Sequence, residues 1–140
     1  MNNQQFRNRY KALSLAMSIL FAVVGLIFLT MPADVLVFFN TVSRMIRIEE
    51  TPVEGFSFYL ILAVGYMYLV SLLAYMMFLH PENKYFICIL INGKSASSAT
   101  SILLCALHRP YLIYATNGVV DGLIAVLLIV VYRKLKAESA

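Results

Sequence analysis

Four apolar stretches, each long enough to cross a lipid bilayer, constrain this chain more than any other feature. They cover residues 12–30, 56–79, 85–107 and 111–132, and about 20 residues of helix span the hydrocarbon core. Hydrophobic residues make up 61% of the chain and charged residues 13%, against about 45–50% and 25% in soluble domains. We therefore predict an all-α membrane protein in which residues 1–140 form a single integral membrane domain, a four-transmembrane-helix bundle.

Basic residues predict how the chain lies in the membrane. Three Lys or Arg residues fall in the connections on one side, and seven fall at the two chain ends and in the turn 80–84 on the other. The seven are Arg7, Arg9, Lys11, Lys84, Arg133, Lys134 and Lys136. Since positively charged segments stay in the cytoplasm, we expect both termini there, in a multi-pass protein of the plasma membrane, or of the inner membrane if the source is bacterial. The same distribution explains the net charge of +4 without a nucleic-acid partner.

The connection between the first two spans has helical amphipathicity. Apolar residues recur at helical spacing from 35 to 46, with Asn40, Arg44 and Arg47 on the opposite side. Beside a membrane, this pattern predicts a short helix over about 33–47 that lies in the outer interface, with an irregular capping loop as the alternative. The segment 51–54 fits a capping box, with Thr51 as N-cap and Pro52 and Glu54 in the first turn. The second span is therefore expected to start there.

Two opposite charges fall deep inside the predicted spans. Lys94 lies roughly 14 Å beyond the start of the third span, and Asp121 is about equally deep in the fourth. An isolated charge at the bilayer centre costs about 2.5–3.5 kcal/mol on insertion scales, so matched depth favours mutual relief. We predict that Lys94 and Asp121 pair across the hairpin, either as a functional site or as a lock between the two spans.

Polar side chains accompany both charges at helical spacing. The stripes of the third and fourth spans that carry the charges also carry serines, an asparagine and a tyrosine. The predicted intramembrane polar site consists of Lys94, Asp121, Asn117, Ser98, Ser101 and Tyr114. Close helix packing is the alternative explanation for the serines, because small residues mark membrane-helix interfaces. By the same rule, the first span presents a helix-packing face made of Ser14, Ser18, Ala22 and Gly25.

No motif in the sequence indicates catalysis or a metal centre. His80 and His108 fall in connections on opposite sides of the membrane, and no Cys/His set has metal-ligand spacing. Cys88 and Cys105 are about 25 Å apart along one predicted helix, beyond the reach of a disulfide. We therefore assign no catalytic residue, no metal and no cofactor, and expect a protein that is not an enzyme.

Three functions stay open on this evidence. The first is a non-enzymatic accessory subunit or a lipid- or quinone-binding module, whose partners would be membrane lipids, a hydrophobic ligand, and a second copy or a larger membrane complex. The second is a transporter or proton-conducting component that uses Lys94 and Asp121, since midplane charges recur in such routes. The third is a lipid enzyme with Lys94 as a base, which the predicted pair opposes because a nearby carboxylate keeps an amine protonated.

Overall fold

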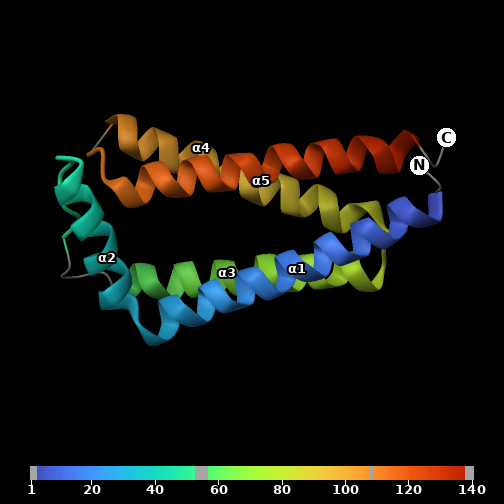
Figure 1. The fold of residues 1–140 in the computed structure, drawn as a ribbon, viewed down its shortest axis with the longest axis horizontal. Coiled ribbons are helices and arrows are strands. Elements are labelled where there is room, and N and C mark those ends of the chain that lie inside the picture. Colours follow the sequence, from blue (N-terminus) through green and yellow to red (C-terminus); the bar gives the residue numbers. More distant parts are fainter. Residues whose placement is uncertain (1–2, 53–56, 108, 138–140) are drawn as a thin grey trace.

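The computed structural model describes residues 3–52, 57–107 and 109–137, and every regular element within them is a helix (Figure 1). The helices are α1 (Asn3–Thr30), α2 (Pro32–Met45), α3 (Ser57–Leu79), α4 (Lys84–Leu107) and α5 (Leu112–Ala137). Four of them, α1, α3, α4 and α5, are long and apolar enough to cross a membrane, as the sequence predicted. Helices α1 and α5 are longer than the apolar runs that identified them, because their polar ends continue the helix beyond the hydrocarbon core.

The four long helices form two pairs. Helix α1 packs along α3, and α4 packs along α5, while the pairs meet mainly through α3 and α4. Figure 1 shows the two pairs as two layers, with α2 across one end and both termini at the other. Helices α3 and α4 are joined by a tight turn, in which the Asn83 side chain accepts a hydrogen bond from the Tyr85 backbone N–H at 3.0 Å. The two helices diverge from that turn (Figure 1), so α3 and α4 pack less closely than helices joined by a short connection usually do.

Small residues bring the partners within each pair close together. On α5, a Cβ atom added to Gly122 would lie 2.9 Å from Ser98 Oγ, and one added to Gly118 would lie 3.0 Å from Ile102. On α1, a Cβ atom added to Gly25 would lie 2.9 Å from the Met67 Cβ. Such approaches leave no room for a methyl group, so glycine at these positions sets the distance between the helices.

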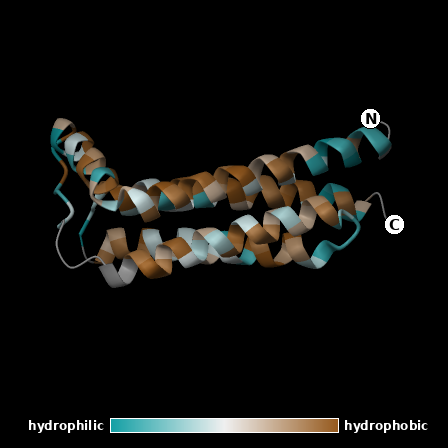
Figure 2. Cartoon of the chain, turned by 90° about the horizontal axis from the view of Figure 1, so that it is seen from below, coloured by the Kyte–Doolittle hydropathy of each residue, from teal (hydrophilic) through white to brown (hydrophobic). Residues whose placement is uncertain are grey.

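The packed core occupies the half of the bundle nearest the termini. Its buried members come from the first part of α1, the second half of α3, the start of α4 and the end of α5. They are Tyr10, Met17, Phe21, Val70, Ala74, Met77, Ile87, Leu90 and Leu128. Large apolar side chains such as Leu26, Ile61, Leu103 and Leu123 are more than half exposed on the outer surface. Figure 2 shows this hydrophobic middle between hydrophilic ends, a distribution that suits a bilayer.

Helix α2 differs from the sequence prediction in the face that it buries. Its buried residues are Leu36, Asn40 and Ser43, whereas Asn40 was predicted to lie on the polar, outward side. The Asn40 amide donates to the Thr51 carbonyl at 2.9 Å and accepts from the Thr51 N–H at 2.8 Å, so burial is offset by two hydrogen bonds. The capping-box prediction is wrong at Pro52, which was predicted at the first helical position and is not helical; Glu54 lies outside the described residues.

Candidate functional site

Lys94 of α4 and Asp121 of α5 form a buried ion pair midway along their helices. The distance from Lys94 Nζ to Asp121 Oδ1 is 2.7 Å, and the two side chains are 1% and 4% exposed. The predicted pairing across the α4–α5 hairpin is therefore confirmed. The close approach follows from the glycines of α5 on either side of the pair, which let the α4 backbone come near.

Two aromatic rings from the other helix pair enclose the ammonium group. Lys94 Nζ lies 4.4 Å from the centre of the Phe21 ring of α1 and 5.0 Å from that of the Tyr66 ring of α3. Both distances are within the range of a cation–π interaction. The Tyr66 hydroxyl also donates to the Gly93 carbonyl at 3.3 Å. All four long helices thus contribute to the surroundings of one charge.

Phe21 was not among the residues predicted for the site. The signal was present, because Phe21 follows Ser14 by seven residues and Ser18 by three, and so shares their face of α1. Tyr66 was not among the residues predicted for the site either, since its ring position depends on how the two helix pairs meet. Helical spacing alone does not determine that arrangement.

Asp121 keeps one carboxylate oxygen without a partner. Oδ1 accepts from Lys94, while the buried Oδ2 has no hydrogen-bond partner among the residues that the structure describes. A buried acceptor left unsatisfied costs about 1–3 kcal/mol, and more when it is charged. The described residues thus supply no donor to this oxygen.

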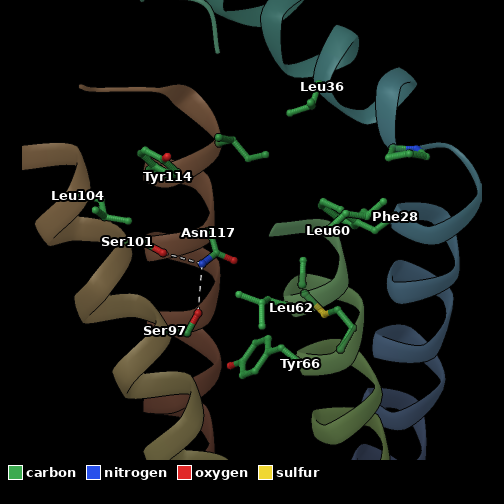
Figure 3. Close-up of a pocket in the computed structure, with 14 residues that line it drawn as sticks. Phe28, Leu36, Leu60, Leu62, Tyr66, Ser97, Ser101, Leu104, Tyr114 and Asn117 are labelled. Carbon is green, nitrogen blue, oxygen red and sulfur yellow. Dashed lines mark hydrogen bonds between the residues drawn. The ribbon is translucent and has the colours of Figure 1, made fainter. Parts of the chain in front are cut away.

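Asn117 and two serines form a second polar group, one turn closer to α2. The Asn117 amide nitrogen donates to Ser101 Oγ at 2.7 Å and to Ser97 Oγ at 3.2 Å. Its carbonyl oxygen points away from both serines, toward the space between the helix pairs (Figure 3). Ser97 was not among the residues predicted for the site, although it lies on the same α4 stripe as Lys94 and Ser101.

Ser98 belongs to the contact between α4 and α5. Its hydroxyl donates to the Gly118 carbonyl at 2.6 Å, and its Oγ is the atom that a Cβ at Gly122 would meet. For this serine, the packing explanation fits the geometry better than a role at the site.

A cavity of about 440 Å³ lies between the helix pairs, in the half of the bundle next to α2. We call it the α3–α4 pocket. Its apolar wall includes Phe28 of α1, Leu36 of α2 and the α3 residues Leu60, Leu62 and Ala63. Its polar wall includes Tyr66, Ser97, Ser101, Tyr114 and Asn117 (Figure 3). Leu62 is 57% exposed, so the rim of this pocket lies on the apolar outer surface of the bundle.

A second cavity, of about 300 Å³, lies between α1 and α5. We call it the α1–α5 pocket. Lys94 and Asp121 line it together with Phe21 and the rim residues Leu20 and Val120, which are 55% and 48% exposed. Both pockets share four wall residues, Phe28, Met67, Ile113 and Asn117. The predicted polar site is thus divided, with the ion pair on the α1–α5 pocket, Ser101 and Tyr114 on the α3–α4 pocket, and Asn117 on both.

Most of the small-residue face predicted on α1 is covered by α3. Ser14 and Ser18 are buried, Ser71 of α3 donates to the Ser18 carbonyl at 2.8 Å, and Gly25 abuts Met67. Ala22 is exposed and does not lie on this face. The face therefore packs within the chain, which leaves it unable to dock a second copy.

The described residues hold no group of three or more His, Cys, Asp or Glu side chains that could bind a metal ion. The chemistry that the site offers is hydrogen bonding and charge inside an apolar surround. Comparisons with protein-family models, with curated proteins and with solved structures return no match for this chain.

Proposed function

We propose that this protein is a non-enzymatic membrane module that binds a mostly apolar molecule, a lipid or a quinone, between its two helix pairs. The observation that carries this proposal is the two-sided lining of the α3–α4 pocket. Leucines and Phe28 form one wall, while Asn117, Ser97 and Ser101 form the other. Ligand sites commonly combine an apolar lining with a few convergent polar groups.

The size and chemistry of the pocket support an amphiphilic ligand. A volume of about 440 Å³ falls within the range of about 300–1,000 Å³ that small-molecule sites occupy. An acyl or isoprenoid chain could extend past Leu62 into the bilayer, so the pocket needs to hold only the polar head and the start of the chain. Asn117 offers a carbonyl oxygen to a donor on the head, and the serine hydroxyls can donate to a carbonyl.

The proposal includes a position in the membrane. We place the protein in the plasma membrane, with both termini in the cytoplasm because the basic residues gather at that end. Helix α2 would then lie in the outer interface, which is supported by its exposed apolar side chains Phe38 (64%) and Met45 (79%). In that position α2 would cover the end of the bundle that contains both pockets.

Recovery of a bound molecule from the purified full-length chain tests the proposal. Native mass spectrometry in mild detergent should detect a retained apolar molecule on the wild-type protein. Ala63→Phe puts a ring into the α3–α4 pocket and should lower its occupancy about tenfold, which corresponds to a loss of about 1.4 kcal/mol in binding. Ala99→Phe makes the same change on the exposed side of α4 and should leave occupancy unchanged. Equal occupancy in the two variants, or no bound molecule in the wild type, would contradict the proposal.

A second candidate function is a transporter or proton-conducting component that uses Lys94 and Asp121. The observation that favours it is the position of the pair, midway along the helices and on the wall of a cavity. Intramembrane ionisable groups of this kind recur in proton and ion routes. Proton flux into proteoliposomes tests this candidate, since flux that is the same for the wild type and Asp121→Asn would remove it.

A further inference from the structure

The buried ion pair leaves one hydrogen-bond acceptor, on Asp121, without a donor among the described residues. One of the three N–H groups of Lys94 donates to Oδ1, and Nζ lies 4.4 and 5.0 Å from the Phe21 and Tyr66 rings, whose faces attract the remaining N–H groups. Asp121 Oδ2 has no partner among the described residues, although an ionised carboxylate can accept through both oxygens. The pair therefore presents one unused acceptor.

Asp121 lines a cavity that is otherwise largely apolar. The α1–α5 pocket holds about 300 Å³, and its walls include the aliphatic side chains Leu20, Val24, Val120 and Ile124. A molecule seated there lies beside Asp121 and these aliphatic groups. Its rim residues face the bilayer, so a long apolar chain can leave the pocket sideways.

The charges around the pocket define the head group that it can hold. Lys94 and Asp121 neutralise each other, so a charged head group would add an uncompensated charge to a buried neutral site. An acceptor-only head, such as an ether or a carbonyl, has no donor for Oδ2 and leaves it unsatisfied. A hydroxyl group satisfies Oδ2 without changing the net charge.

From this geometry we propose that the α1–α5 pocket is a second binding site, for an uncharged, mostly apolar molecule whose hydroxyl group donates to Asp121 Oδ2. Fatty alcohols and benzoquinols share this chemistry. The site adjoins the α3–α4 pocket, but neither Lys94 nor Asp121 lines that pocket, so the site does not require that pocket to be occupied.

Matched probes test the donor requirement on the full chain in lipid nanodiscs. One pair is 1-dodecanol and dodecyl methyl ether, and the other is a short-chain benzoquinol and its benzoquinone, measured without oxygen. Dissociation constants come from the rise in unfolding temperature with probe concentration. A hydrogen bond to a charged acceptor predicts that the donor of at least one pair binds roughly 10- to 100-fold more tightly than its partner. The pair that shows the preference distinguishes an alcohol from a quinol.

Aspartate labelling gives a second readout that needs no variant. The chain has two aspartates, Asp34 and Asp121, so ¹³Cγ-labelled aspartate gives two side-chain carboxyl signals in an NMR spectrum. Asp34 is exposed and serves as the internal control, assigned with Asp34→Asn. The Asp121 signal should shift when the hydroxyl probe is added and stay in place with its matched acceptor, while the Asp34 signal stays in place with both.

Two variants complete the test. The double change Lys94→Gln and Asp121→Asn replaces the ion pair by two neutral amides, and should reduce the donor preference to less than about threefold. Ala63→Phe fills the α3–α4 pocket and should leave the preference intact. Equal binding within both probe pairs, an unmoved Asp121 signal, or a preference that survives the double change would overturn the proposal. A preference abolished by Ala63→Phe would also overturn it, while supporting a ligand in the α3–α4 pocket.

Discussion

Lys94→Met leaves Asp121 buried without its cation, and Asp121→Leu leaves Lys94 without its anion. Breaking a buried pair by removing one partner costs about 3–5 kcal/mol of stability. The cost of Asp121→Leu should lie at the low end of this range, because the Phe21 and Tyr66 rings near the ammonium still contribute about 0.5–2 kcal/mol. The double variant removes both charges and should lie within about 1 kcal/mol of the wild type. With single costs of about 4 and 3 kcal/mol and a double cost near zero, the coupling energy is roughly 7 kcal/mol.

The free energy of unfolding can be measured in mixed micelles by titration with SDS, with helical circular dichroism as the signal. Lys136→Met makes the same change as Lys94→Met at an exposed position near the end of α5, and should alter stability by less than about 0.5 kcal/mol. If each single change at the pair costs less than about 1 kcal/mol, or if the two costs add in the double variant, the argument from burial and pairing is refuted.

Three further predictions concern the packing that holds the site. Gly122→Ala should lower the free energy of unfolding by about 1–3 kcal/mol through overpacking, because the new Cβ would lie 2.9 Å from Ser98 Oγ. The same SDS titration measures this cost. Gly65→Ala is the control, because its new Cβ meets nothing within 4 Å, and it should be neutral or stabilising. Ser71→Ala should cost about 0.6–1.7 kcal/mol in that assay, because it removes the 2.8 Å bond to an α1 carbonyl. Asn40→Ala should speed amide hydrogen exchange at residues 46–52, because two hydrogen bonds to that segment are lost.

The four spans and the ion pair were predictable because each depends on one-dimensional information. The length of an apolar run decides whether a helix can cross the bilayer, and the number of residues from the turn decides how deep a charge lies. Lys94 and Asp121 lie at matching depths on consecutive helices, so their pairing follows from the cost of leaving either alone. Neither inference requires knowledge of how non-consecutive helices pack.

The errors arose where the rotation of a helix about its axis matters. At about 100° per residue, Ala22 is turned about 80° from Ser14 on α1, whereas Phe21 is turned by only about 20°. Phe21 is therefore buried and Ala22 exposed. On α2, the apolar pattern predicted the amphipathic helix but not the burial of Asn40, because in a membrane an apolar face can point toward lipid as well as toward the bundle. The two pockets were not predictable, since they depend on the splay of α3 from α4.

The sizes of the side chains explain why the bundle is closely packed near the termini and contains two pockets near α2. Gly118 and Gly122 let α5 lie close to α4 beside the ion pair. Among the described residues, α5 makes little contact with α1. Toward the termini, Met77, Leu90 and Leu128 fill the space between the pairs. In the half of the bundle next to α2, the side chains do not fill the space between the pairs, and both pockets lie there. Lys94 lies at this boundary and is the polar group of the α4–α5 pair that contacts rings of both α1 and α3. Its charge therefore links the two pairs at the point where close packing ends.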